Sequence, residues 1–255
     1  MHNKKDTIAL YSLMKFSIKI FFILALMLSG HGITVAGQQR NDKLLNRPYA
    51  DLRRWHLGFS VGVHTQDLQF THNGFVTESG ESWFMEQPSF SPGFCVNGLI
   101  DFRLNNFFNV RLTPGMYFGN RNIEMRDANG GLTESQNIKS NLIVMPVDLK
   151  FSAVRYYNAR PYLIAGAMAT FDISRKKQRE LLQLKSTDLY LTIGFGCDFY
   201  LPYFKFNPEV KFCFGLCNMI EQDRPDLSED PDKLKFTQSL TKATSQMVVF
   251  TFYFE

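Results

Sequence analysis

The chain has 255 residues, and 15% aromatic against only 20% charged residues is an unusual composition for a soluble protein. The net charge is +4, but residues 1–37 hold four lysines and one aspartate, so the remainder carries 24 basic and 23 acidic residues. That balance excludes a dedicated nucleic-acid binder, which needs a concentrated basic face. A mean hydropathy of −0.16, with no apolar run of about 20 residues, excludes a bundle of transmembrane helices.

The N-terminal segment has the pattern of an export signal. Lys19 precedes the nine apolar residues Ile20 to Leu28, and small residues follow up to Gly37. This order predicts a cleaved signal peptide over residues 1–37, with translation starting at Met1 or Met14. A buried amphipathic helix is the alternative. We expect residues 38–54 to form a periplasmic N-terminal segment and residues 55–255 to form one domain.

Eight segments of the mature chain alternate apolar and polar residues with a period of two, which is typical of β-strands. In the first segment, Trp55, Leu57 and Phe59 oppose His56 and Ser60. The segments are Trp55–Thr65, Phe94–Leu104, Phe108–Phe118, Ile143–Phe151, Tyr162–Ile173, Leu189–Phe199, Phe206–Leu216 and Val248–Phe254.

The lengths of the strands and of their connections favour a membrane barrel. Strands of roughly 10 residues match tilted strands that cross a hydrocarbon layer. Outer-membrane barrels alternate short periplasmic turns with long external loops. Here the short links are residues 105–106, 153–159 and 202–203, and the long links are residues 66–91, 119–138, 174–186 and 218–244. We therefore predict an all-β fold, an eight-stranded antiparallel up-and-down transmembrane β-barrel.

Aromatic residues gather at the strand ends that we expect to face the periplasm. Such residues form girdles at the two interfaces of membrane barrels. We assign to this girdle Trp55, Phe107, Phe108, Tyr156, Tyr157, Tyr162, Tyr200, Tyr203, Phe204 and Tyr253.

The polar faces of the strands carry acids and bases in near balance, which suits a lumen filled by ion pairs. A soluble barrel or sandwich, with this face in water, is the alternative. The proposed lumen network consists of Asp101, Arg103, Arg111, Asp148, Lys150, Asp188, Asp198, Glu209 and Lys211.

No motif predicts a catalytic, cofactor or metal site. Cys213 and Cys217 are about 13 Å apart in an extended strand, too far for a disulfide, and form no CxxC pair. With Cys95 and Cys197 they are expected to be free thiols, or to form at most one cross-strand bridge. His56 and His64 are expected to be structural.

A membrane-embedded enzyme is an alternative that would need His72 to act with Ser79 or Ser82 in the first long loop. No spacing motif links these three residues. A His72→Ala activity test addresses this alternative.

The stretch Asn46 to Asp51, followed by Trp55 to Phe59, Gly62 and His64 to Leu68, resembles the start of PorT-family outer-membrane proteins of Bacteroidota. The eight-strand pattern resembles the same family over essentially the whole mature chain. The resemblance implies an outer-membrane barrel associated with the Por, or type IX, secretion system. It implies no catalytic residue.

We interpret the protein as an integral outer-membrane barrel with surface-exposed loops that acts as an accessory or assembly component of a secretion machine. Its expected partners are outer-membrane lipid and other envelope or secretion proteins. An eight-stranded barrel has an interior just wide enough for side chains, so it would not be the conduit. A structural or adhesive barrel acting through its external loops is the competing interpretation.

Overall fold

The computed structural model describes residues 46–72, 83–86, 91–127, 133–174, 184–221 and 239–255. The predicted signal peptide, residues 38–45 and parts of all four predicted long loops lie outside these ranges. Within the described ranges, no helix is long and apolar enough to cross a membrane.

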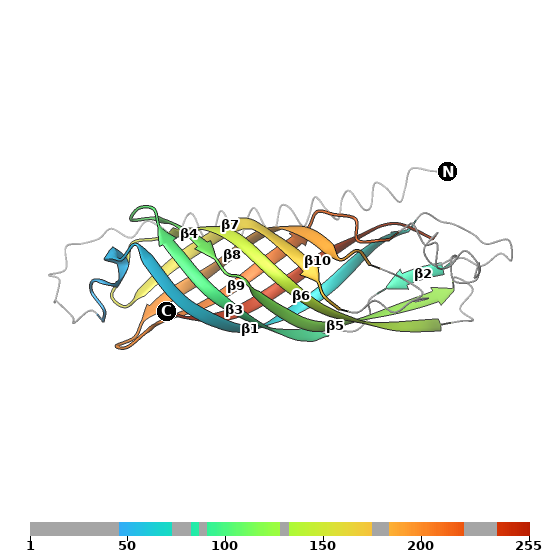
Figure 1. Ribbon diagram of the computed structural model, residues 1–255, viewed down its shortest axis with the longest axis horizontal. Coiled ribbons are helices and arrows are strands. Elements are labelled where there is room, and N and C mark those ends of the chain that lie inside the picture. Colours follow the sequence, from blue (N-terminus) through green and yellow to red (C-terminus); the bar gives the residue numbers. More distant parts are fainter. Residues whose placement is uncertain (1–45, 73–82, 87–90, 128–132, 175–183, 222–238) are drawn as a thin grey trace, which may run out of the picture. The chain divides into compact units, whose positions relative to one another are not determined.

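The strands form a closed antiparallel ring (Figure 1). In chain order they are β1 (Trp55–His72), β2 (Trp83–Glu86), β3 (Pro92–Arg103), β4 (Phe108–Leu112), β5 (Gly115–Asp127), β6 (Thr133–Ser152), β7 (Ala159–Asp172), β8 (Thr187–Tyr200), β9 (Lys205–Gly215) and β10 (Leu240–Phe254). Leaving out the short β2, each strand of the ring pairs with the next one along the chain. β1 closes the ring on β10, with Phe59 opposite Phe254.

β4 and β5 are two parts of one ring strand. Ile100 pairs with Leu112 and Asn97 with Gly115, so the register against β3 is unchanged between the two parts. The ladder is interrupted because Pro114 has no N–H to donate, although its carbonyl accepts a hydrogen bond from Gly98 N at 2.8 Å. The ring therefore has eight strands, which confirms the predicted fold class. The short β2 pairs only with the far end of β5.

The two ends of the ring differ. At the short-turn end, residues 104–107, 153–158 and 201–204 join neighbouring strands. At the opposite, long-loop end, several strands continue well beyond their predicted limits. β1 runs to His72, β5 to Asp127, and β6 starts at Thr133, so the predicted loops 66–91 and 119–138 are partly strand. This corrects the predicted strand ends.

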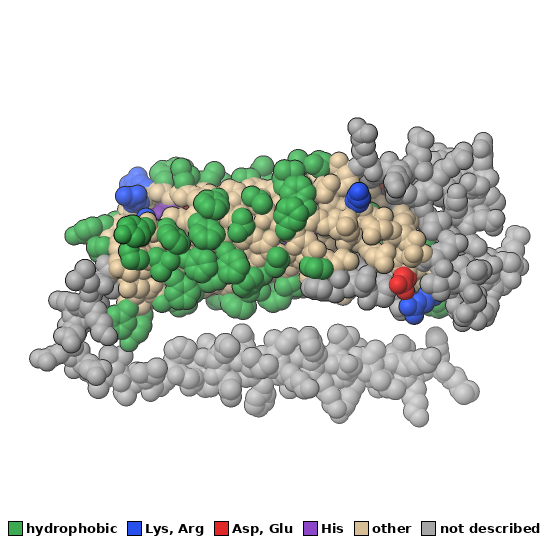
Figure 2. Space-filling view, turned by 90° about the horizontal axis from the view of Figure 1, so that it is seen from below, with side chains coloured by type: hydrophobic (Ala, Val, Ile, Leu, Met, Phe, Trp, Pro, Cys, Tyr) green, Lys and Arg blue, Asp and Glu red, His purple; other side chains and the backbone are tan. Residues whose placement is uncertain are grey.

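Sidedness in the short-turn half follows the predicted pattern of apolar side chains outward and polar side chains inward. On β1, Leu57, Phe59 and Val63 are exposed, whereas His56 and Ser60 are buried. Figure 2 shows hydrophobic side chains covering this part of the wall, with polar surface toward the long-loop end. The outer wall thus carries an apolar band over the short-turn half.

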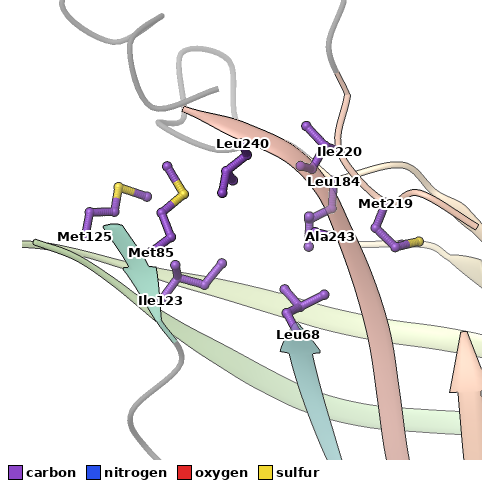
Figure 3. Packing of buried hydrophobic residues seen from close by; sticks show 9 residues of the cluster. All are labelled: Leu68, Met85, Ile123, Met125, Leu184, Met219, Ile220, Leu240 and Ala243. Atoms are coloured by element: carbon purple, nitrogen blue, oxygen red, sulfur yellow. The ribbon is translucent and has the colours of Figure 1, made fainter. Parts of the chain in front are cut away.

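Toward the long-loop end of the same strands, the outward side chains become polar and the inward side chains become apolar. On β1, Asp67 and Gln69 continue the exposed face, while Leu68 continues the buried face. On β5, Asn120 is exposed and Ile123 buried. Figure 3 shows the resulting interior cluster of Leu68, Met85, Ile123, Met125, Leu184, Met219, Ile220, Leu240 and Ala243. Beyond the apolar band, the barrel therefore has the apolar interior and polar exterior of a protein in water.

The short-turn end carries exposed aromatic rings, as the predicted girdle requires. Exposed rings are found at Trp55, Phe107, Tyr156, Tyr157, Tyr203 and Phe204, and Phe108 is half-buried. Tyr162, Tyr200 and Tyr253 instead point into the lumen, where they are 3%, 1% and 2% exposed. Their assignment to the girdle is wrong, because each lies on the inward phase of its strand.

The apolar band can be tested on one face of β1, where Val61 lies within the band and Gln69 beyond it. We expect Val61→Arg to lower the free energy of unfolding by about 2–4 kcal/mol, the cost of Arg at the midplane of a bilayer. Gln69→Arg should cost less than about 1 kcal/mol. Denaturant titration of the barrel in lipid vesicles measures both values, and equal effects would contradict the assignment of the band to lipid.

Candidate functional site

Charged side chains fill the lumen of the short-turn half, with Glu209 on β9 at their centre. Its Oε2 accepts hydrogen bonds from Arg111 Nη1 and Tyr162 OH, each at 2.9 Å, and its Oε1 accepts one from Tyr253 OH at 3.1 Å. Arg111 on β4 also donates through Nε to Asp101 Oδ2, at 3.1 Å. β4 and β9 lie opposite each other in the ring, so the Arg111–Glu209 pair spans the lumen.

Lys211 extends this group toward β6. Its Nζ lies 2.6 Å from Asp148 Oδ2 and 3.6 Å from Glu209 Oε1. Thr192 Oγ1 donates to the other oxygen of Asp148, at 2.7 Å. Both carboxylate oxygens of Asp148 are thereby satisfied by side chains from two other strands.

A second chain of ion pairs lies nearer the short-turn mouth. Lys150 Nζ lies 2.7 Å from Asp198 Oδ2, and Lys205 Nζ lies 3.9 Å from the same oxygen. Lys205 Nζ and His56 Nδ1 each lie 2.6 Å from Glu255 Oε1. Acids and bases therefore alternate from β6 through β8 and β9 to β1.

Tyrosine rings pack against the cations of both groups. Lys150 Nζ lies 4.0 Å from the centroid of the Tyr162 ring. Arg111 Cζ lies 5.2 Å from the same centroid and 5.0 Å from that of Tyr253. These distances suit cation–π attraction, so Tyr162 contributes both an OH donor and a ring face.

The charges are retained because each has a partner. An isolated charge loses several kcal/mol of hydration on burial, which only close opposite charges and hydrogen bonds offset. Arg111, Lys150 and Glu209 are no more than 1% exposed, so side chains fill the cross-section at their level. Such a layer acts as a plug across the barrel.

Of the nine predicted lumen residues, the structure brings seven together: Asp101, Arg111, Asp148, Lys150, Asp198, Glu209 and Lys211. Arg103 lies elsewhere, because β3 ends there and its guanidinium donates to Asn105 O and Asn106 Oδ1 in the adjoining turn. Asp188 lies near the long-loop end of β8, where its Oδ1 accepts the backbone N–H of Leu189 at 2.8 Å. Within the described residues, no cation lies within 4.0 Å of Asp188.

Sequence reasoning missed several members of the network. Lys205 is the first residue of β9 and Glu255 directly follows β10, and both lie outside the predicted segments Phe206–Leu216 and Val248–Phe254. The aromatic pattern assigns Tyr162 and Tyr253 to the girdle instead. The inward phase of their strands was the one signal that could have identified the two tyrosines.

A short segment, residues 46–54, crosses the mouth at the short-turn end, and we call it the strap. It contains a 3-10 helix, Ala50–Leu52, and leads into β1. Its far end is held at the β6–β7 turn, where Asn46 N donates to Asn158 Oδ1 at 2.9 Å and Arg155 donates to the carbonyls of Asn46 and Arg47. β7 lies opposite β1 in the ring, so the strap spans the whole mouth.

The strap is also fixed between its two ends. Asn46 Nδ2 donates to Tyr200 O at 3.0 Å, and Arg47 Nη1 donates to Glu255 O at 2.9 Å. Tyr200 OH donates to Asp51 Oδ1. These contacts join the strap to the ends of β8 and β10 and close the lumen below the ion pairs.

The described part of the chain shows which contacts His64 and His72 make. His64 stacks on Tyr117, with ring centroids 4.9 Å apart, and His72 Nε2 accepts the backbone N–H of Met85 at 2.9 Å. Ser79 and Ser82 lie outside the described residues. Among the described His, Cys, Asp and Glu residues, no group of three or more could hold a metal ion.

All four cysteines are described, and none is bonded to another. Cys95 and Cys213 are buried, Cys197 is half-buried and Cys217 is exposed. Cys217 is exposed because it lies beyond the end of β9 at Gly215.

The coupling of the ion pairs is measurable at Lys150 and Asp198. Asp198→Leu leaves buried Lys150 without its closest partner, and we expect a loss of about 3–5 kcal/mol in the free energy of unfolding. The double variant Lys150→Met/Asp198→Leu should be less destabilised than the sum of the single variants by at least about 1 kcal/mol. Arg103→Gln in the turn is the control, with an effect below about 0.5 kcal/mol. Additive single effects would mean that the pair is not coupled.

The anchoring of the strap can be tested by proteolysis of the purified barrel. Arg155→Ala removes the bonds to Asn46 and Arg47 and the stacking of Arg155 on Tyr200, whose centroid lies 3.6 Å from Arg155 Cζ. Trypsin should then cut within the strap roughly tenfold faster, as expected for about 1.4 kcal/mol of easier local opening. Arg103→Ala should leave the rate unchanged. A wild-type rate in Arg155→Ala would show that Arg155 does not hold the strap.

Comparison with solved structures returns outer-membrane barrels at low identity. The outer membrane protein OprG from Pseudomonas aeruginosa is 13% identical over 78% of this chain and 92% of its own, with a TM-score of 0.44. The N-terminal β-barrel domain of Pseudomonas aeruginosa OprF is 12% identical over 76% of this chain and 96% of its own, with a TM-score of 0.33. The translocator domain of the autotransporter NalP from Neisseria meningitidis is 8% identical over 78% and 88%, with a TM-score of 0.27.

No curated protein matches the sequence. The family described as "Outer membrane protein beta-barrel domain" matches residues 36–221, which is well over half of the chain. This match agrees with the closed ring of eight strands and with the apolar band on its outer wall. The chain therefore belongs to the outer membrane protein beta-barrel domain family.

Proposed function

We propose that this outer-membrane barrel is an accessory or assembly component of an envelope protein-secretion machine, and that it works through protein contacts. The observation that carries the proposal is the Arg111–Glu209 pair across the lumen, with the strap below it. A barrel filled in this way has no route for cargo and acts through its outer surfaces. The resemblance of residues 46–68 to PorT-family proteins supports a type IX-like machine.

In this proposal the short-turn end faces the periplasm and the long-loop end faces the outside. The alternation of short and long connections supports this orientation, since bacterial outer-membrane barrels place their short turns in the periplasm. On β1 the outward side chains change from apolar to polar near Thr65, and this change supports a boundary with water at the long-loop end.

A structural or adhesive role through the long loops is the second candidate. It is favoured by the apolar core at the long-loop end, because that core gives the extended β5 and β6 a folded base beyond the apolar band. An enzymatic role has less support, since His72 bonds the backbone of β2. A His72→Ala variant with full activity in any assay of the envelope fraction would remove that role.

Crosslinking in intact envelopes tests the proposal. Full-length protein with an affinity tag between residues 226 and 232 is crosslinked and purified, with an eight-stranded barrel of similar size as the control. We expect envelope secretion proteins to copurify with this barrel and not with the control barrel. Cells that lack this barrel should retain cargo that is normally secreted. Normal secretion in those cells, together with no capture beyond the control, would contradict the proposal.

A further inference from the structure

The outer surface of the strap is unlike the surface of a simple plug. Ala50 faces the barrel and is 7% exposed, whereas Tyr49 is 75% and Leu52 is 64% exposed. Arg53 and Arg54 are also exposed. A plug gains stability by burying its large apolar side chains. The strap instead presents them away from the lumen.

The short-turn end is also strongly basic. Its acid Asp51 lies 3.5 Å from Arg160 and 4.0 Å from Arg155 and accepts a hydrogen bond from Tyr200, so its charge is already matched. Glu255 is buried beneath the strap. The arginines that the described residues place at this end are Arg47, Arg53, Arg54, Arg103, Arg155 and Arg160.

Arg53 and Arg54 provide the accessible positive charge. Four of the arginines donate to carbonyls of the turns, of the strap or of Glu255, and Arg160 in this way joins the 153–158 turn to Asn106. Within the described residues, no carboxylate lies within 4.0 Å of the Arg53 or Arg54 guanidinium. Because the strap is fixed at several points, little further ordering is required when a partner binds.

From this arrangement we propose that Tyr49, Leu52, Arg53 and Arg54 form a docking surface for an acidic segment of a periplasmic protein. The inference rests on the proposed function and its orientation. Guanidinium groups bind carboxylates in a bidentate geometry. Apolar side chains of the partner that lie between its carboxylates would cover Tyr49 and Leu52. Tyr and Arg are also enriched in protein interfaces. The strap crosses the mouth of the lumen, whereas lipid surrounds the outer wall, which favours a protein over a phosphate headgroup.

Site-specific photocrosslinking of the full chain in living cells tests the surface. A benzophenone amino acid is placed at position 49 or 52 of the strap, or at position 203 as the control. Tyr203 is 92% exposed in a turn at the same end. We expect protein adducts at positions 49 and 52 that are at least about fivefold stronger than those at position 203. In the charge-reversed Arg53→Glu/Arg54→Glu background, the yield of adducts at 49 and 52 should fall about fivefold or more.

Two controls secure the interpretation. Arg126→Glu, at the long-loop end, should leave the adducts unchanged, and heat-modifiable gel migration shows that each variant has folded. Arg53→Gln/Arg54→Gln should give an intermediate loss. Raising the salt concentration in isolated envelopes should weaken the wild-type adducts, since contacts between exposed charges are screened.

The inference is overturned by lipid adducts alone at 49 and 52, or by protein adducts that survive charge reversal. Its failure differs from failure of the proposed function. If whole-envelope crosslinking captures secretion proteins but positions 49 and 52 do not, the barrel has a partner that docks elsewhere. If neither captures one and secretion is normal, the function itself fails.

Discussion

The pairing of β1 with β10 is the constraint on which the rest of the structure depends. In hydrocarbon every backbone N–H and C=O must be paired within the protein, so a sheet that crosses a membrane must close on itself. Closure with eight strands leaves an interior just wide enough for side chains. Charges that point inward must then satisfy one another, and Glu209, with Arg111 and two tyrosine hydroxyls, does so across the full width of the ring.

The period of two in the sequence was sufficient to predict the eight ring strands and most of the lumen. Phase assigns Phe59 and Val61 to one face and Asp148 and Lys211 to the other, because the strands alternate along their length. Strand length and the alternation of short and long links then turn the apolar face outward. The strand ends at the long-loop side were not predicted. There Leu68 and Ile123 take the inward phase and polar residues the outward one, so the outward apolar face stops although the strand continues.

Which side chains pair across the lumen was harder to predict than which side chains face it. Arg103 has the inward phase, but the chain turns immediately after it, and the turn carbonyls bind its guanidinium. Asp188 also has the inward phase and lies too far along β8 to reach the ion pairs. Lys205 and Glu255 were missed for the opposite reason, since each lies one residue outside a predicted segment and yet reaches the network. The reach of a side chain depends on its height in the barrel, which the registers of neighbouring strands decide.

The barrel is filled in layers along its axis: the strap, the ion pairs and the long-loop apolar cluster, with a further apolar group that includes Val144, Met168 and Val249. The ion pairs and the two apolar groups consist of buried side chains.

Ion conductance of the purified full chain in a planar lipid bilayer shows whether this lumen is filled. We predict inserted protein with no sustained conducting steps, and none when Arg111 and Glu209 are both replaced by alanine, because the strap and the two apolar groups still fill the lumen. Stable steps through the wild-type barrel at moderate voltage would contradict it, because ions would then pass the level at which Arg111 is 0% exposed.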